Sequence, residues 1–426
     1  MEKSFKDFLI NVREKNIVCF GTGEYLVIAK RLLKKHNLTI SYTVDNDFWK
    51  SGTDIEGIEV STVDRLVHDE LNKICVLICD FDIYNIAEQL KEAGIYNFYA
   101  LPLFAEEWYR YQNRFIMQIP FSNRIPPKWG QQCHITIVNA CNLSCPFCAF
   151  AENPSTGEFM PYEAFLRIAD QLKSMRINGQ KVDTIRLGGN KEGLLHPHFV
   201  DMAHHLDCGG FKSRLVTNGF LMTKEIATVI VEHLHHIRIS ITGVTNEVYH
   251  HFQGSKRANS DNIFNTVVDN IAELVKIRNS LNSSCYIDIG YICTEFSAHQ
   301  IKDAILFWRK KGIDRIIFFH EGSEVTLPLK NTDDNEICYT NANEARQVCF
   351  YTTTIAANGD VYPCCAPNGE YMPIGNCFKT SLNEIFNSQK FYMFRNNLAS
   401  LNPKQLPHKC RRCTVIAYKK YLHCQH

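Results

Sequence analysis

The sequence lacks three features that would place it at a membrane, outside the cell or on nucleic acid. It has no run of eighteen apolar residues, so no segment could cross a bilayer as a helix. Its charged start, MEKSFKDFLINVREK, lacks the apolar core of a signal peptide. Lys plus Arg is 46 and Asp plus Glu is 45, so the net charge of +1 gives no basic footprint for nucleic acid. We therefore expect a cytoplasmic protein with neither a membrane nor a nucleic-acid partner.

Repeats and low-complexity tracts are also absent, and the length of 426 residues predicts two or three domains. Cysteine, by contrast, is abundant, with 18 residues. In a long chain without an export signal, a reducing compartment and metal-bound thiolates fit this number better than disulfides do.

Three of the cysteines lie within eight residues, in the stretch CNLSCPFC at 141–148. Their spacing is Cys141-x-x-x-Cys145-x-x-Cys148, whereas a zinc site usually shows two paired hooks that close a tetrahedron. Three thiolates can bind three irons of a 4Fe–4S cube and leave the fourth iron open to an external ligand. The alternatives are a structural metal knuckle or three free buried cysteines.

With this spacing the sequence resembles the radical S-adenosylmethionine (SAM) enzymes. The resemblance implies a SAM-binding 4Fe–4S cluster on Cys141, Cys145 and Cys148, whose open iron chelates the amino and carboxylate groups of SAM. One electron then cleaves SAM to methionine and a 5′-deoxyadenosyl radical. The resemblance also implies that Phe147 lies against the adenine.

The segment 131–320 alternates six predicted strands with helices. This count fits the partial (β/α)6 barrel of the radical SAM family, an α/β fold with its chemistry at the carboxyl ends of the strands. The predicted strands are HITIVNA, VDTIRLGG, SRLVTN, IRISITG, SCYIDIGYIC and DRIIFF.

Family motifs follow several of these strands. LGGNKEGLLHP, at 187–197, resembles the family's glycine-rich turn, which implies a cofactor role for Gly189 and a pairing of Glu192 with the SAM amino group. The alternative for Glu192 is a solvated loop residue. By the same resemblance, Asn218 in TNG and Ser240 in ISITG contact the SAM side of the site.

The segment 1–115 reads strand, glycine turn, helix, strand, which predicts a doubly wound Rossmann-like domain that binds substrate or a partner. Its fingerprint has Gly21 and Gly23, but Leu26 stands in place of the third glycine, so a bound nucleotide and an empty docking cleft both stay open. Residues 116–130 carry three prolines and little periodicity, and we interpret them as a linker.

The segment 345–426 resembles the SPASM or Twitch extension of radical SAM enzymes. The resemblance implies that Cys349, Cys364, Cys410 and Cys413 ligate an auxiliary 4Fe–4S cluster. A zinc ribbon is the alternative, because zinc also accepts four thiolates. The roles of three further cysteines in this part of the chain stay open: Cys365, Cys377 and Cys424.

The resemblance implies an enzyme whose radical abstracts hydrogen from an unactivated carbon. The Rossmann-like first segment favours a sugar, nucleotide-linked sugar or related small metabolite, with dehydrogenation, epimerisation or rearrangement as the outcome. Flavodoxin or ferredoxin is the expected electron donor. The alternatives are a maturase of a ribosomally made peptide and an iron–sulfur electron carrier that does no SAM chemistry.

Overall fold

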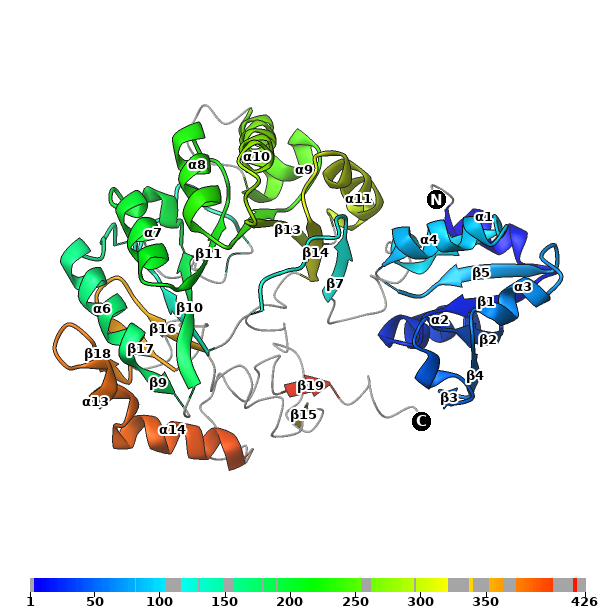
Figure 1. Ribbon diagram of the computed structural model, residues 1–426, viewed down its shortest axis with the longest axis horizontal. Helices are drawn as coiled ribbons and strands as arrows, with labels where there is room; N and C mark the ends of the chain where they lie inside the picture. The colour runs from blue at the N-terminus through cyan, green and yellow to red at the C-terminus, as the bar shows by residue number, and fades with distance from the viewer. Residues whose placement is uncertain are drawn as a thin grey trace.

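Two large β-sheets organise the part of the chain that the structure, a computed structural model, describes (Figure 1). A six-stranded sheet lies in the first hundred residues, an eleven-stranded sheet follows, and a two-stranded pair, β15 (Ile337–Tyr339) with β19 (Ala417–Lys419), stands apart. The described residues are 4–80, 82–104, 116–128, 131–146, 148, 156–177, 180–188, 191–253, 262–294, 296–320, 337–339, 352–363, 373–400 and 417–419.

The six-stranded sheet is a doubly wound sheet with the order β3-β4-β2-β1-β5-β6. β1 pairs in parallel with both β2 and β5, the arrangement of a mononucleotide-binding fold. Its strands are β1 (Asn16–Phe20), β2 (Ile40–Val44), β3 (Asp54–Ile55), β4 (Ile58–Ser61), β5 (Ile74–Ile78) and β6 (Phe98–Ala100). Its helices are α1 (Phe5–Asn11), α2 (Glu24–Lys34), α3 (Asp64–His68) and α4 (Ile83–Glu92), with short 3-10 turns at Phe48–Lys50 and Leu101–Phe104.

The eleven-stranded sheet has the predicted six parallel strands at its centre, in the order β8-β10-β11-β12-β13-β14. The fold class inferred from the sequence is therefore confirmed. These strands are β8 (Gln131–Ile135), β10 (Gln180–Gly188), β11 (Lys212–Thr217), β12 (His236–Ile241), β13 (Tyr286–Cys293) and β14 (Arg315–His320), and the short β9 (Arg176–Ile177) pairs with β10.

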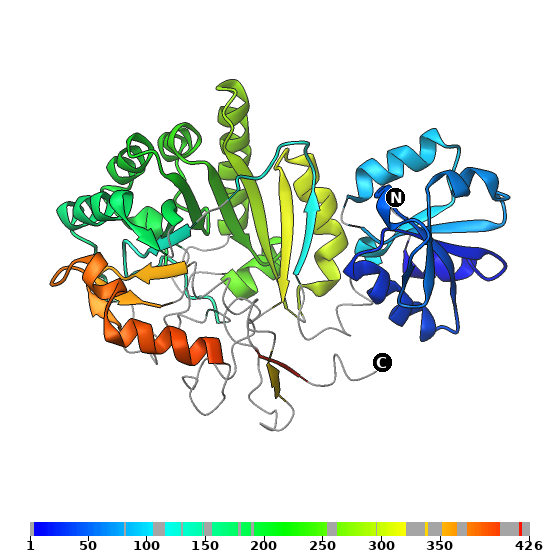
Figure 2. The same cartoon turned by 60° about the horizontal axis from the view of Figure 1, so that its bottom comes forward.

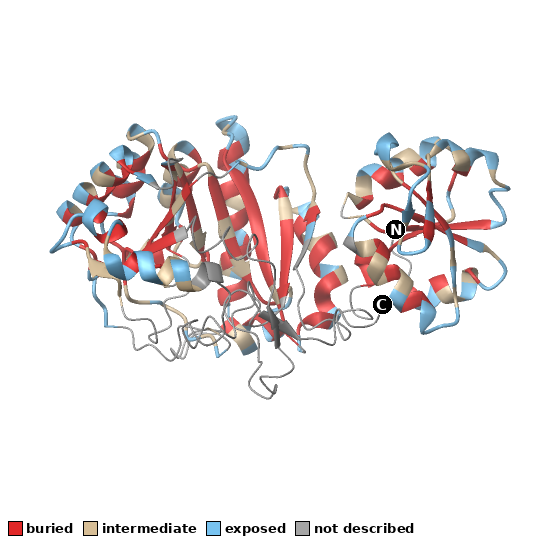
Figure 3. Ribbon diagram, turned by 90° about the horizontal axis from the view of Figure 1, so that it is seen from below, coloured by how far each residue is buried: buried red, intermediate tan, exposed pale blue. Residues whose placement is uncertain are grey.

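Helices connect these strands and cover one face of the sheet (Figure 1). They are α6 (Tyr162–Ser174), α7 (Phe199–Cys208), α8 (Lys224–His233), α9 (Asn246–Gln253), α10 (Ile263–Ser280) and α11 (Ile301–Lys310), with 3-10 turns at Gly193–Leu195 and Ala298–Gln300. The strands between them are buried (Figure 3).

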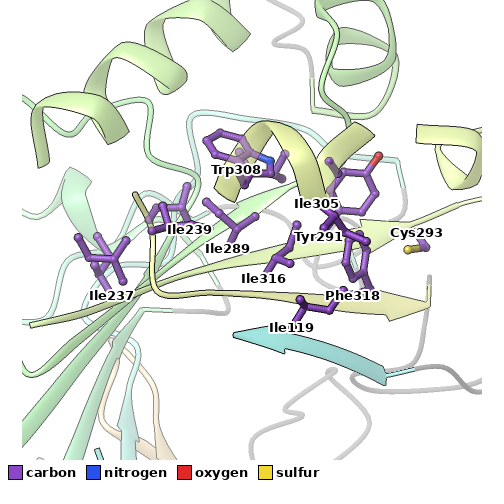
Figure 4. Packing of buried hydrophobic residues seen from close by; sticks show 14 of the residues in the cluster. Ile119, Ile237, Ile239, Ile289, Tyr291, Cys293, Ile305, Trp308, Ile316 and Phe318 are labelled. Carbon is purple, nitrogen blue, oxygen red and sulfur yellow. The ribbon is translucent and has the colours of Figure 1, made fainter. Parts of the chain in front are cut away.

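The core lies between the central strands and these helices. Alternate residues of a strand point to the same face, so Ile237 and Ile239 of β12 and Ile289 of β13 share one apolar surface. Ile305 and Trp308 of α11, one helical turn apart, pack on this side (Figure 4). The residues that alternate with Ile237, Ile239 and Ile289 along β12 and β13 therefore face the other side of the sheet.

The predicted linker at 116–130 is partly wrong. Ile116–Pro120 forms the strand β7, which pairs antiparallel with β14 at one edge of the large sheet. Ile119 is fully buried there. The prolines misled the prediction, because Pro120 lies at the very end of the strand, where an edge strand tolerates a residue without an N–H.

At the other edge the large sheet continues into the C-terminal part of the chain. β16 (Thr352–Ile355) pairs in parallel with β8, and β17 (Asp360–Tyr362) and β18 (Gly375–Asn376) extend the sheet further. The stretch NGDVYP, at 358–363, contains the turn of the β16–β17 hairpin and its second strand. The sequence did not indicate that this hairpin joins the barrel sheet. Two helices follow, α13 (Leu382–Phe386) and α14 (Gln389–Ser400) (Figure 2).

The six-stranded sheet unit contacts the large sheet unit through α4. The guanidinium of Arg309, on α11, lies 3.6 Å from the centre of the Tyr84 ring, and the Phe121 ring lies 6.2 Å from it. In the described part of the chain, no helix is both long and apolar enough to cross a membrane.

Candidate active site at the carboxyl ends of the central strands

The three-cysteine loop follows β8, at the carboxyl end of the first central strand. Cys141 is exposed, Cys145 and Cys148 are partly buried, and the backbone N–H of Cys148 donates to the Cys145 carbonyl at 3.1 Å. Burial raises the pKa of the Cys145 thiol to about 12, and the neighbouring Cys148 and Cys141 raise it as well. Although Cys141 as a residue is exposed, desolvation of its thiol raises the pKa, and Glu192 and Cys148 raise it further. The loop therefore brings three thiols and one carboxylate into a single electrostatic site.

The donor set of this loop fits an iron–sulfur cluster with one open iron. Three thiols on one short loop supply three soft ligands, and a cluster on them would also relieve the mutual repulsion that opposes their ionisation. Among the described residues, no three His, Cys, Asp or Glu side chains are arranged as a metal site. The three thiols therefore lie on one loop, but they are not at the mutual distances that metal coordination requires.

Glu192 is held beside this loop by hydrogen bonds to both of its carboxylate oxygens. Oε1 accepts from the Leu194 N–H at 3.1 Å and from the Thr217 hydroxyl at 2.8 Å, and Oε2 accepts from the Asn218 N–H at 2.9 Å. The side chain is buried, so desolvation raises its pKa, and the three hydrogen bonds oppose that rise. Glu192 is therefore buried and hydrogen-bonded, so the alternative of a solvated loop residue is wrong.

Asn218 ties the carboxyl end of β11 to the cysteine loop. Its side-chain amide donates to Oδ1 of Asn142 at 2.7 Å, and its own Oδ1 accepts from the Phe220 N–H at 3.0 Å. The backbone N–H of Glu192 donates to the Ala140 carbonyl at 3.0 Å, just before the loop. Three strand ends, those of β8, β10 and β11, are therefore fastened together around the thiols.

The turn after β10 requires glycine. Gly188 has φ +71°, and a Cβ there would lie 3.0 Å from the Val216 carbonyl oxygen of the neighbouring strand. Gly193 packs against Gly188, so that a Cβ on it would lie 3.6 Å from the Gly188 Cα. These glycines let the loop that carries Glu192 pass close to β11. Gly189 itself lies outside the described residues.

Ser240 lies at the carboxyl end of β12, next to Gly290 in the register with β13. Its carbonyl accepts from the side-chain amide of Gln253 at 2.9 Å, and the Thr242 hydroxyl donates to the same amide group at 2.9 Å. These bonds anchor α9 to the strand end. A contact between the Ser240 hydroxyl and SAM stays a prediction.

Several predicted site residues lie outside the described residues: Phe147, Cys349, Cys364, Cys410 and Cys413, together with Cys365 and Cys424. Cys377 is described and buried, and burial raises the pKa of its thiol to about 12. Its N–H donates to the Gly359 carbonyl at 2.8 Å. The environment of Cys377 is that of a small core residue.

Tyr249, on α9, is a buried residue that no sequence motif indicates. The side chain is completely buried, and its hydroxyl has no hydrogen-bond partner in the described part of the structure. Burial raises its pKa, and the nearby Cys145, Glu192 and Cys141 raise it further. In the α9 sequence NEVYHHFQ, nothing marks Tyr249 as a site residue rather than a core residue.

A row of charged side chains on the face opposite the helices was also missed. β10, β11, β12 and β14 carry Arg186, Arg214, Arg238 and Arg315 there, which we call the arginine row. Asp288 of β13 is fully buried and accepts from Arg238 Nε at 2.9 Å and from Arg315 Nη2 at 2.6 Å. No single segment revealed the row, because its members are on four strands and meet only through strand register.

In the first segment, the acid expected at a ribose site makes internal contacts. Asp45, which directly follows β2 where a ribose-binding acid would lie, accepts from the Thr22 N–H at 3.1 Å and pairs with Lys50 at 3.2 Å. Gly21 has φ +112°, and a Cβ there would lie 2.7 Å from the Cys79 carbonyl oxygen. This glycine therefore serves a tight turn between neighbouring strands, which is consistent with the docking alternative.

Comparisons with known proteins match two parts of the chain. Residues 135–288 match the model of the Radical SAM superfamily, and residues 348–414 match the SPASM model, an iron-sulfur cluster-binding domain. A curated relative from Pyrococcus furiosus, the tungsten-containing aldehyde ferredoxin oxidoreductase cofactor-modifying protein, is 23% identical over 227 residues. The match covers 53% of this chain and 60% of that relative, so the chain spans less than two thirds of its length.

Solved structures of three proteins are similar to this chain at low identity. BtrN in complex with AdoMet and 2-DOIA has a TM-score of 0.42 at 15% identity, covering 68% of this chain and 94% of its own. The anSMEcpe enzyme with AdoMet and a Cp18Cys peptide has a TM-score of 0.47 at 15% identity, covering 67% and 88%. SuiB of Streptococcus suis bound to its precursor peptide SuiA has a TM-score of 0.45 at 15% identity, covering 67% and 70%.

Proposed function

We propose that this chain, a radical SAM enzyme with a C-terminal SPASM domain, abstracts hydrogen from a sugar, a nucleotide-linked sugar or a related small metabolite. Cys141, Cys145 and Cys148 are the proposed ligands of its SAM-binding 4Fe–4S cluster. The observation that carries the site is the convergence of these thiols with Glu192 and Asn218 at three strand ends.

The chemistry that the bound cluster supplies is one electron, which splits SAM into methionine and the 5′-deoxyadenosyl radical that takes hydrogen from carbon. The protein's part is to bind and orient. Glu192 has two hydrogen bonds on Oε1 and one on Oε2, and the remaining acceptor capacity is available to the SAM amino group. A carboxylate fits this role because it accepts hydrogen bonds from the amino N–H groups and leaves the nitrogen lone pair to iron.

The auxiliary site is proposed for Cys349, Cys364, Cys410 and Cys413. The first two flank the β16–β17 hairpin in sequence, and β16 pairs with β8, the strand that leads into the three-cysteine loop. An auxiliary cluster at this hairpin would therefore lie on the same sheet as the SAM site. Such a cluster either accepts the electron of the substrate radical or shapes the pocket. Flavodoxin or ferredoxin is the proposed donor of the first electron.

The arginine row supports an anionic substrate, because its four guanidinium groups outnumber the one carboxylate, Asp288, that pairs with Arg238 and Arg315. Its guanidinium groups are on the face of the sheet opposite the helices, and Arg238 is two residues before the strand end that carries Ser240. The neighbouring His134 has a pKa well below its usual value, because burial and the charges of Arg186 and Arg214 oppose its protonation. The phosphates of a nucleotide-linked sugar complement such a surface.

A second candidate is maturation of a peptide or of a protein-bound cofactor. It draws on the name of the Pyrococcus furiosus relative, which is described as cofactor-modifying. A neutral peptide would not need the arginine row, and this difference separates the two candidates.

The experiment has two stages. Anaerobic reconstitution should give about eight irons per chain, for two cubane clusters, whereas about four would leave the C-terminal cysteines without iron. Reduction with dithionite in the presence of SAM should then release 5′-deoxyadenosine. Candidate substrates deuterated at carbon are added next, and the true class transfers deuterium into 5′-deoxyadenosine. Transfer from a peptide but not from a nucleotide-linked sugar would reject the first candidate.

A further inference from the structure

The arginine row has two levels along the strands, and one of them borders the proposed active site. The upper level, nearer the carboxyl ends, consists of register partners on five neighbouring strands: Gly188, Val216, Arg238, Asp288 and Arg315. Arg186 and Arg214 are register partners two residues earlier on their strands. β10 ends at Gly188 and leads into the loop that carries Glu192. Two members of the row, Arg238 and Arg315, are therefore at the level where that loop begins.

Arg315 is held in place by protein groups. Its Nη2 donates to Oδ2 of Asp288 at 2.6 Å, and its Nη1 donates to Oε1 of Gln118, on β7, at 2.9 Å. Its guanidinium carbon lies 5.3 Å from the centre of the Tyr286 ring. Both terminal nitrogens of Arg315 thus have an acceptor inside the fold, and this arginine links β7, β13 and β14.

Arg238 instead extends toward the carboxyl ends. A Cβ at Gly290 would lie 3.0 Å from Cδ of Arg238, so the arginine stem crosses β13 at this glycine. Gly290 is two residues after Asp288 and is the register partner of Ser240. The Arg238 guanidinium carbon lies 5.2 Å from the centre of the Phe319 ring, which comes from near the end of β14. The side chain therefore reaches from its own level to that of Ser240.

The carboxylate of Asp288 fixes the direction of this arginine. It accepts from Nε of Arg238 at 2.9 Å and from Nη2 at 3.4 Å, and it is fully buried, whereas the Arg238 side chain is partly exposed. One carboxylate shared by two guanidinium groups leaves a net positive charge on the three groups. A guanidinium that is already fixed loses little entropy on binding, and its planar fork matches two phosphate oxygens.

We propose that Arg238 binds the substrate by donating hydrogen bonds to a phosphate of the nucleotide-linked sugar, and that Asp288 and Gly290 position it. The inference rests on the proposed function and assigns the substrate contact to one member of the arginine row. Gly290 belongs to the proposal because a side chain there would enter the space of the arginine stem. A phosphate bound by Arg238 would hold the sugar beside the strand end that carries Ser240.

The test uses inorganic pyrophosphate as a probe for the phosphates, added to the anaerobically reconstituted full chain with SAM bound. Calorimetric titration should give at least tenfold weaker pyrophosphate binding for Arg238→Gln than for the wild type. Arg238→Lys, which keeps the charge beside Asp288 and so protects the fold, should bind about fivefold more weakly, because an ammonium group lacks the planar fork. The control is Arg167→Gln, an exposed arginine on α6, which should bind pyrophosphate as the wild type does.

Gly290→Ala tests the positioning role. It should weaken pyrophosphate binding severalfold although Arg238 is still present, while SAM affinity and reductive release of 5′-deoxyadenosine stay at the wild-type values. Wild-type pyrophosphate affinity in Arg238→Gln or Arg238→Lys would overturn the inference, as would a wild type that cleaves SAM but does not bind pyrophosphate. A wild type that releases no 5′-deoxyadenosine would instead overturn the proposed function.

Discussion

The side-chain amide of Asn218 donates a hydrogen bond of 2.7 Å to Oδ1 of Asn142 and so joins the carboxyl end of β11 to the three-cysteine loop. The two residues are 76 positions apart in the chain. Only Asn218 has a motif around it, and Asn142 is one of the unassigned positions between two of the cysteines. The bond makes the pair a unit that positions the loop relative to Glu192.

This pair predicts a non-additive double-mutant cycle. Asn142→Ala and Asn218→Ala should each weaken SAM binding about fivefold, because the loss of one hydrogen bond costs about 1 kcal/mol. The double variant should be little weaker than either single one, because the same bond is lost once. Equilibrium binding of SAM to the reconstituted protein measures all four forms. Fully additive losses would show that the bond does not position the loop.

Replacing one loop thiol should abolish the chemistry without unfolding the chain. We expect Cys145→Ala to lose the SAM-binding cluster and all release of 5′-deoxyadenosine, because two thiolates do not hold a cube with one open iron. The matched control is Cys208→Ala, an exposed cysteine at the end of α7, which should keep both. Iron content, circular dichroism and 5′-deoxyadenosine are measured together. Activity in folded Cys145→Ala protein would reject the assignment of this loop.

Glu192→Gln should raise the dissociation constant of SAM at least tenfold while leaving the cluster in place. The amide is nearly isosteric, but it lacks the negative charge that attracts the N–H groups of the iron-bound SAM amino group. Its NH2 would also meet the Asn218 N–H, which now donates to Oε2, and an unsatisfied buried donor costs about 1–3 kcal/mol. Unchanged SAM affinity at a normal iron content would show that a residue other than Glu192 binds the SAM amino group.

Truncation tests the first segment and the corrected boundary. A chain that begins at residue 116 keeps β7 and should still cleave SAM, whereas product formation falls because remote substrate binding is lost. A chain that begins at residue 131 loses β7 and exposes the edge of β14, so it should aggregate. Equal behaviour of the two chains would show that β7 does not protect this edge. Unchanged product formation by the longer chain would assign the first segment no part in the reaction.

Acid should destabilise the fold in a defined window because of His236. Burial lowers the pKa of this side chain from 6.5 to about 4, despite Asp288, whose Oδ2 lies 3.0 Å from Nε2. Between these values the unfolded chain binds a proton that the folded chain excludes, so stability falls as the pH drops from 6.5 to 4. The melting temperature measured across this range should fall less steeply in His236→Gln than in the exposed-site control His204→Gln. Parallel curves of melting temperature against pH for the two variants would show that His236 does not cause the loss of stability in acid.

The sequence alone determined the local elements and the chemistry of the loop. Alternating apolar runs and helical periods gave the six parallel strands at the centre of the large sheet, since these patterns follow from the geometry of single strands and helices. The spacing of Cys141, Cys145 and Cys148 predicts the cluster type, because that spacing is short enough to be set within one loop. The acid Glu192 followed from a contiguous motif in the same way.

Only the tertiary structure decided which distant residues complete the site. The edge strand β7, the pairing of β16 with β8, the Asn142–Asn218 bond and the place of Tyr249 all join segments that no local pattern relates. The arginine row shows the same limit, because its members are on four strands and meet only through strand register. Register depends on packing of the whole sheet against its helices, and so it is a property of the fold rather than of any one segment.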